Sequence, residues 1–249
     1  MDVMPGAEPF SFKGGKLGVL LVHGFTGNPQ SLHPWGEFLR DAGLTVSCPL
    51  LPGHGTNWKD LAARNYPEWV ATAQGALEDL SAHCPTVVVM GLSMGGTLTL
   101  HLAATNPDRV KGLVLVNASV VSKDPRLKIL GPLKLLVPSV KGVGNDVKGH
   151  DFKELAYDRV PLKALASFVQ LQKLVHSELD KIHQPLRIFV SREDHVVEPE
   201  NAALIASKVS SNDVKTTWLE DSYHVATLDN DRTQIFGQSL EFARSLAGS

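Results

Sequence analysis

The sequence is poor in cysteine and in net charge, and each shortage excludes a class of protein. Only two cysteines occur in 249 residues, Cys48 and Cys84. A chain of this length buries enough apolar surface to fold without a disulfide between them, and two cysteines in this arrangement fit no zinc motif. Lys and Arg number 24 against 26 Asp and Glu, a formal net charge of −2. Such a balance offers no basic surface for nucleic acid.

Long hydrophobic runs are missing too. No run approaches the ~20 apolar residues that a membrane-spanning helix needs. The beginning of the chain, MDVMPGAEPFSF, has neither the basic nor the apolar region of a signal peptide. With 43% hydrophobic residues and a small net charge, the chain has the composition of a folded domain, not of a disordered one. We therefore expect a globular cytoplasmic protein.

Short apolar runs rich in valine and leucine recur along the chain, with longer helical patterns between them. We expect strands at residues 17–23, 45–51, 86–91, 111–117, 186–191 and 215–219, and helices at residues 30–42, 67–82, 94–105, 201–209 and 232–246. Continuous apolar runs are typical of strands covered on both faces, as in a parallel sheet. The repeated strand–helix order predicts an α/β fold with a mostly parallel, doubly wound sheet.

Residues 120–183 break this rhythm, because no strand is convincing there and two helices fit the pattern better. An apolar face at helical spacing is formed by Leu165, Phe168, Leu171, Val175 and Leu179. The interval holds 11 Lys and Arg against 7 Asp and Glu, although the whole chain carries −2. We expect an all-helical cap over one edge of the sheet. The chain then divides into a core of residues 1–119 and 184–249 and a cap insert of residues 120–183.

The most specific motif is Gly91-Leu92-Ser93-Met94-Gly95, which fits G-x-S-x-G. It follows the apolar run TVVVM and opens the helical pattern GTLTLHLAA. In a nucleophile elbow the serine occupies a strained turn between a strand and a helix, and the flanking glycines allow close approach of the backbone. The N–H groups at the helix N-terminus then face the reacting oxygen. We predict that Ser93 is a catalytic nucleophile; the alternative is a chance match in a loop.

A serine nucleophile needs a base and an acid, which follow it in the order Ser, acid, His in elbow enzymes. Ten histidines are present, but only His195 and His224 lie downstream of a plausible acid. His224 follows the last predicted strand, where a loop can carry it over the strand ends. His195 directly follows Asp194, so these two side chains should point apart. We predict Asp194 as the acid and His224 as the base, with Asp221 and Glu193 as rival acids.

The oxyanion hole of such a site needs two backbone N–H groups. One is expected from Met94, the residue after the nucleophile. The loop at residues 23–27, HGFTG, follows the strand LGVLLV and supplies the other from Phe25, with its glycines permitting the tight bend. An ordinary glycine-rich turn is the alternative for this loop.

Together these motifs resemble the α/β-hydrolase superfamily, and more closely the bacterial monoacylglycerol lipases and small thermostable carboxylesterases. The matching stretches are GAEPF at 6–10, GVLLVHGFTG at 18–27, GHGT at 53–56, GLSMGGTLTL at 91–100, KELAY at 153–157, FVSREDHVV at 189–197 and SYHVATLD at 222–229. The resemblance implies the triad Ser93, Asp194 and His224, with Phe25 and Met94 as oxyanion donors. It therefore agrees with the motif-based prediction. Residues 120–150 carry no family motif, which leaves the substrate preference open.

The leading prediction is a serine hydrolase that releases fatty acid from monoacylglycerols or short-to-medium acyl esters through an acyl-enzyme. Neither a metal nor an organic cofactor is implied, and the expected partner is a small-molecule ester and not a nucleic acid. One alternative is an aminopeptidase or C–C hydrolase on the same scaffold, since a fold does not determine function. The other is a non-catalytic ligand-binding relative, although such proteins usually lack a triad member.

The resemblance to monoacylglycerol lipases further implies that Glu154, in the stretch KELAY, binds the glycerol head group. A carboxylate accepts hydrogen bonds, which suits the two free hydroxyls of a monoacylglycerol. The alternative is a solvated helix residue paired with Lys153 or Arg159.

The cap insert also combines basic and apolar residues. The basic residues are Lys123, Arg126, Lys128, Lys134 and Lys141, and the apolar residues among them are Ile129, Leu130, Leu133, Leu135, Leu136 and Val137. Because a basic, apolar segment can lie on an anionic interface, we expect weak contact of the cap with membrane surfaces. A solvated face over a buried one is the alternative.

Overall fold

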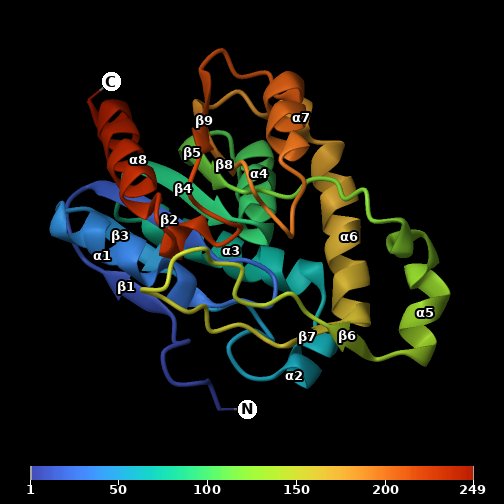
Figure 1. Ribbon diagram of the computed structural model, residues 1–249. Helices are drawn as coiled ribbons and strands as arrows, with labels where there is room; N and C mark the ends of the chain where they lie inside the picture. Colours follow the sequence, from blue (N-terminus) through green and yellow to red (C-terminus); the bar gives the residue numbers. More distant parts are fainter. Residues whose placement is uncertain (1, 249) are drawn as a thin grey trace.

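A computed structural model describes residues 2–248, and its centre is a seven-stranded sheet (Figure 1). The strands are β1 (Phe10–Phe12), β2 (Leu17–Val22), β3 (Thr45–Cys48), β4 (Thr86–Leu92), β5 (Val110–Val116), β8 (Leu186–Ser191) and β9 (Val214–Leu219). Their order in the sheet is β1-β3-β2-β4-β5-β8-β9. β1 runs antiparallel to β3, and the other neighbouring strands are parallel. The predicted α/β class with a mostly parallel sheet is confirmed.

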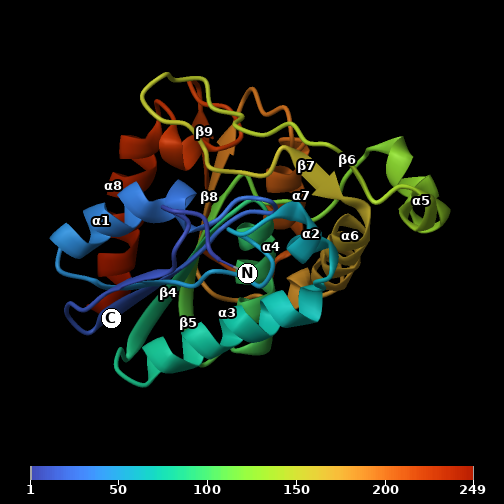
Figure 2. The same ribbon diagram turned by 90° about the horizontal axis from the view of Figure 1, so that it is seen from below.

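Helices cover both faces of this sheet, as Figures 1 and 2 show from two sides. The helices of the core are α1 (His33–Asp41), α2 (Trp58–Ala62), α3 (Tyr66–Ser81), α4 (Met94–Thr105), α7 (Glu200–Lys208) and α8 (Arg232–Ala247). α1 and α8 pack on one face, and α3, α4 and α7 pack on the other. The central strands β2, β4, β5 and β8 bury nearly all of their residues between these layers, which explains their continuous apolar sequences.

The predicted strands and helices of the core are all present, with small differences at their ends. The strand expected at residues 45–51 ends at Cys48, because Pro49 has no N–H to donate to a neighbouring strand. The helix expected at residues 30–42 begins as the short 3-10 helix Pro29–Leu32 before α1. β1 and α2 were not predicted, since elements of three and five residues have no measurable periodicity.

Residues 120–183 lie outside the seven-stranded sheet. Their regular elements are η2 (Pro125–Ile129), α5 (Leu130–Leu136), β6 (Ser139–Lys141), β7 (Arg159–Pro161), α6 (Leu162–His176) and η3 (Leu179–Lys181). The expectation of an all-helical insert is wrong, because β6 and β7 form an antiparallel pair with Val140 opposite Val160. Strands of three residues, separated by a long irregular stretch, show no alternation that a sequence pattern could reveal. The predicted helix face is confirmed for the residues that lie on α6, with Leu171 and Val175 buried in the core, whereas Leu179 is buried on η3, beyond the end of α6.

α6 and α5 form successive layers beyond the core helices. α6 packs against α3 and α4, and α5 packs on α6 and extends away from the sheet (Figure 1).

Both cysteines behave as small apolar side chains. Cys48, at the end of β3, and Cys84, just before β4, are free and buried. Within residues 2–248, no helix has the length and apolar character needed to cross a membrane.

Candidate active site

Ser93 lies in the turn between β4 and α4. Its backbone has φ 56° and ψ −118°, a conformation that is strained for a residue other than glycine. Its N–H donates to the carbonyl of Val116 on β5 at 2.9 Å, which anchors the turn in the sheet. The motif glycines are sterically required: a Cβ on Gly91 would lie 2.2 Å from the carbonyl oxygen of Gly95, and a Cβ on Gly95 would lie 1.9 Å from that of Val22. The strand–turn–helix geometry predicted for the elbow is present.

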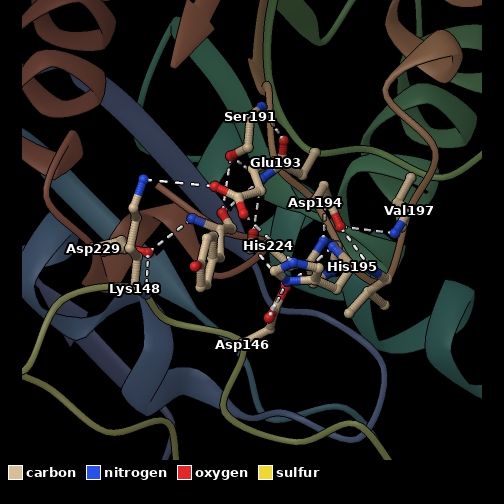
Figure 3. Close-up of polar contacts among 12 residues, drawn as sticks. Asp146, Lys148, Ser191, Glu193, Asp194, His195, Val197, His224 and Asp229 are labelled. Atoms are coloured by element: carbon tan, nitrogen blue, oxygen red, sulfur yellow. Dashed lines mark hydrogen bonds and ion pairs between the residues drawn. The ribbon is translucent and has the colours of Figure 1, made fainter. Parts of the chain in front are cut away.

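His224 and Asp194 form a buried hydrogen-bonded pair (Figure 3). Nδ1 of His224 and Oδ2 of Asp194 are 2.8 Å apart, and the two side chains are 8% and 2% exposed. Asp194 follows β8 and is oriented by the N–H groups of Val196 and Val197, which donate to its Oδ1 at 2.8 Å each. His224 lies in the loop after β9, where Asn117 donates to its carbonyl at 2.8 Å. Because a carboxylate accepts hydrogen bonds, the imidazole carries its proton on Nδ1 and leaves Nε2 as an acceptor.

Three carboxylates determine the pKa of His224. Burial alone would lower this pKa, but the charge and hydrogen bond of Asp194, with the charges of Glu154 and Asp146, raise it above its usual value of 6.5. For Asp194, burial acts to raise the pKa, but the charge and hydrogen bonds around it, led by His224, lower it. The pair therefore stabilises the imidazolium form that arises when His224 accepts a proton.

The rival residues have other partners. Nδ1 of His195 is 2.8 Å from Oδ1 of Asp146, and the side chain of His195 is about half exposed. Glu193 and Asp221 lie near Lys148, whose Nζ is 3.6 Å and 3.1 Å from their carboxylates. His195 therefore pairs with a different carboxylate from the one that holds His224.

The loop at residues 23–27 passes beside Ser93. A Cβ on Gly24 would lie 3.3 Å from the Cβ of Ser93 and 3.9 Å from its Oγ. Phe25, the next residue, lines the same cavity as Ser93. Met94 is the first residue of α4, so its N–H belongs to the turn whose N–H groups have no acceptor within the helix. Both residues predicted as oxyanion donors therefore lie beside Ser93.

A buried histidine orients the peptide bond before Phe25. Leu51 donates its N–H to Nε2 of His23 at 3.1 Å, so His23 carries its proton on Nδ1 and donates it to the carbonyl of Gly24 at 3.0 Å. In a trans peptide the carbonyl and the next N–H point in opposite directions, so the N–H of Phe25 is directed away from His23. Burial lowers the pKa of His23 to about 4, which keeps the ring neutral at ordinary pH. No pattern in the sequence indicates this role for His23.

Ser93 and His224 line one cavity of about 570 Å³, a volume typical of small-molecule sites. Its wall includes apolar side chains from residues 120–183, namely Leu127, Leu130, Leu133, Val140, Leu162, Leu165 and Phe168. Among residues 2–248, no group of three or more His, Cys, Asp or Glu side chains is arranged to hold a metal ion. The cavity therefore offers an apolar surface that leads to a serine, a histidine and a few carboxylates.

Glu154 lines this cavity from the stretch between β6 and β7, which is not helical. The side chain is half-buried, and a Cβ on Gly27 would lie 2.9 Å from its Oε1. Asn145 accepts the N–H of Glu154 through Oδ1 at 2.6 Å. Burial raises the pKa of the Glu154 carboxyl. The alternative of a solvated helix residue does not describe this position.

Two carboxylates beside the Asp194–His224 pair were not predicted from the sequence. Oδ2 of Asp146 accepts the N–H of His224 at 3.1 Å, across a separation of 78 residues. Oδ2 of Asp229 accepts the N–H of Tyr223 at 2.9 Å. Asp146 belongs to no sequence motif. Asp229 is the last residue of the stretch SYHVATLD, so its presence near His224 could have been predicted.

Comparisons with known proteins agree with this geometry. A family profile described as "Serine aminopeptidase, S33" matches residues 16–231. The chain is 44% identical over 246 residues to a thermostable monoacylglycerol lipase of Bacillus sp. (strain H-257), covering 99% of this chain and 98% of that one. It is 30% identical to a carboxylesterase of Bacillus subtilis (strain 168), covering 96% and 97% of the two chains.

Solved structures show the same likeness. A structure described as "LipS and LipT, two metagenome-derived lipolytic enzymes" superposes with a TM-score of 0.95 at 40% identity, over 98% of this chain and 100% of that one. The monoacylglycerol lipase of Paleococcus ferrophilus superposes with a TM-score of 0.81 at 19% identity, over 99% and 100% of the two chains, and so shares the fold.

Proposed function

We propose that this chain, a carboxylic ester hydrolase that belongs to the α/β-hydrolase superfamily and to its serine aminopeptidase S33 family, acts through a serine acyl-enzyme. The observation that carries the proposal is the hydrogen bond of 2.8 Å between Asp194 and His224, with His224 lining the same cavity as the elbow residue Ser93. Relatives named as a monoacylglycerol lipase and a carboxylesterase support an ester as the bond that is cleaved.

The geometry supports a two-step reaction. Oγ of Ser93 attacks the ester carbonyl carbon while Nε2 of His224 takes its proton, and Asp194 stabilises the imidazolium. The N–H groups of Phe25 and Met94 stabilise the negative charge that develops on the carbonyl oxygen. His224 then protonates the departing alcohol, which leaves the acyl group on Ser93. Water attacks this acyl-enzyme, gives its proton to His224, and the fatty acid is released as Ser93 recovers its proton.

Monoacylglycerol is the substrate class that best matches the cavity. The apolar wall of the cavity suits an acyl chain, and the carboxylate of Glu154 suits a head group with two free hydroxyls. A diacylglycerol has one free hydroxyl and a triacylglycerol has none, so Glu154 would be desolvated without full compensation. A buried polar group without its partner costs roughly 1–3 kcal/mol. Discrimination among glycerides therefore needs no contact with the acyl chain.

Residues 120–183 act as the cap of this enzyme, over a core of residues 1–119 and 184–249. Ser93 and His224 come from the core, whereas Glu154 and much of the apolar wall come from the cap. The cap would therefore determine which ester reaches the nucleophile.

The outer side of the cap is suited to weak contact with an anionic membrane surface. Ile129, Leu135 and Leu136 are 57%, 75% and 83% exposed. Among the basic residues of this segment, Lys134 lies on α5, Lys123 and Arg126 pair with Glu200 and Asp124, and Lys141 also lines the cavity. The side chain of Lys128 lies outside the part that the structure describes. Exposed leucines next to basic side chains favour an anionic interface.

A substrate panel tests the proposed function. Hydrolysis rates are measured for mono-, di- and triacylglycerols of one acyl chain, for a p-nitrophenyl ester and for an aminoacyl-anilide, with the Ser93→Ala variant as the blank. We expect the monoacylglycerol to be the best glyceride and the anilide to be inert. Cleavage of the anilide in preference to every ester would instead favour an aminopeptidase.

A further inference from the structure

Asp146, a carboxylate of the insert, holds the two chain segments that carry the acid–base pair (Figure 3). Its Oδ2 accepts the N–H of His224 at 3.1 Å and that of His195 at 3.3 Å. Its Oδ1 is 2.8 Å from Nδ1 of His195, and its main-chain carbonyl accepts the N–H of Val225 at 3.0 Å. Only 11% of the Asp146 side chain is exposed, so its carboxylate depends on these protein partners for hydrogen bonds.

Asp229 makes the reciprocal contact from the His224 loop to the insert. Its side chain is buried, and its oxygens accept four backbone N–H groups. Oδ2 accepts those of Lys148 at 2.7 Å and Tyr223 at 2.9 Å, and Oδ1 accepts those of Gly149 and Asn230 at 2.8 Å each. A buried carboxylate is stable only with such partners. The insert and the His224 loop therefore hold each other through two carboxylates.

We propose that Asp146 is a positioning residue for His224, through which the insert fixes the orientation of the imidazole. The proposal rests on the proposed function, in which His224 is the base. Asp146 holds the N–H of His224 and Asn117 holds its carbonyl, so the main chain is fixed on both sides. The hydrogen bond to Asp194 then needs to fix only the side-chain torsion angles of His224.

The charge of Asp146 contributes as well as its geometry. The titratable groups that face His224 are Asp194 from the loop after β8, and Glu154 and Asp146 from the insert. His195 faces Asp146 on its other side. Each of the three carboxylates raises the pKa of His224, so removal of one charge lowers it. Removal of a carboxylate whose charge does not act on His224 would leave this pKa unchanged.

The test compares Asp146→Asn with Asp158→Asn, which removes the same charge from an exposed position of the insert. Both variants are assayed on p-nitrophenyl acetate, which has no glycerol head group for Glu154 to bind. We expect Asp146→Asn to lower kcat roughly 10- to 100-fold with little change in KM, because the neutral amide has one acceptor oxygen where the carboxylate has two and so positions His224 less firmly. The acid limb of its kcat/KM profile should move to lower pH. Asp158→Asn should match the wild type in both measurements.

Equal kcat values and acid limbs for the two variants would overturn the proposal, and so would a loss of kcat with an unmoved acid limb. Thermal unfolding shows whether each variant is folded at the assay temperature. Should Asp146→Asn not fold, Asp146→Glu keeps the charge but displaces the carboxylate. The proposal then requires reduced kcat with a wild-type acid limb, and unchanged kcat contradicts it. Phosphonate labelling of wild-type Ser93 tests the proposed function separately.

Discussion

Among single residues, His224 is central to the proposed mechanism because its two ring nitrogens have different roles in it. Nδ1 is held by Asp194 in a buried pair, which leaves Nε2 as the proposed acceptor for the proton of Ser93, a residue that lines the same cavity as His224. His195, one residue after the acid, is half-exposed and hydrogen-bonded to Asp146. We therefore expect His224, and not His195, to act as the base.

Replacement of each histidine by alanine should separate these contributions. Because triad members act as a unit, His224→Ala should lower kcat for ester hydrolysis by roughly 10⁴-fold or more. His195→Ala removes one partner of Asp146 and leaves the backbone contact to His224, so its effect should be much smaller. Steady-state rates on a p-nitrophenyl ester provide the measurement. Equal losses in the two variants would refute the assignment of the base.

The pH profile follows from the charges around His224. The base works only when neutral, and its pKa lies above 6.5 because Asp194, Glu154 and Asp146 outweigh burial. We therefore expect kcat/KM to fall as the pH decreases through a value above 6.5. Glu154→Gln removes one of these charges and should shift the acid limb to lower pH, whereas Glu241→Gln, at an exposed position of α8, should not. A limb that stays in place in both variants would contradict this electrostatic account.

The head-group role of Glu154 can be tested with the same pair of variants at a pH above the acid limb. Glu154→Gln should lower kcat/KM for monoacylglycerol by roughly 5- to 150-fold, the equivalent of 1–3 kcal/mol. Activity on a methyl or p-nitrophenyl ester should be retained, because these esters present no glycerol hydroxyls. Glu241→Gln should leave both activities unchanged. An equal loss on both ester classes would mean that Glu154 supports the fold and does not bind the head group.

Among the elements of the fold, α5 presents different residues to its two sides. Leu130 and Leu133 line the cavity, whereas Leu135 and Leu136 are largely exposed. α5 therefore has an inner side that lines the cavity and an outer side with exposed leucines.

Vesicle binding tests the outer side of α5. We expect weak binding to anionic vesicles that decreases with added salt, because basic side chains supply part of the attraction. Leu135→Ser with Leu136→Ser should reduce this binding while activity on a soluble ester persists. Sedimentation with anionic and zwitterionic vesicles provides the measurement. Salt-insensitive binding, or none, would exclude a role for this surface.

The elements of the core were predictable because their sequences carry a strong pattern. Buried central strands appear as continuous apolar runs, and longer helices show periodicity. The short strands β6 and β7 were not predictable, because their pairing depends on contacts between segments that lie apart in the chain. The elbow was identifiable because Gly91 and Gly95 are required by local packing around Ser93.

For the molecule as a whole, the parallel sheet brings the predicted catalytic residues to one edge. The loop at residues 23–27 follows β2, Ser93 follows β4, Asp194 follows β8 and His224 follows β9. Carboxyl ends of parallel strands lie at one edge of a sheet, which is where α/β proteins bind ligands. Motif order along the chain was therefore enough to predict this part of the site. Asp146 was not predictable, because its role depends on a contact across 78 residues that no local pattern encodes.

Active-site labelling tests the central claim, that Ser93 is the nucleophile of an ester hydrolase. Wild-type protein and Ser93→Ala are treated with a fluorophosphonate, and the modified peptide is identified by mass spectrometry. We predict one adduct on the peptide that contains Ser93, no adduct in the variant, and loss of ester turnover of roughly 10⁴-fold or more with an unchanged Tm. An adduct on another serine, or labelling and turnover that persist in folded Ser93→Ala, would contradict the account.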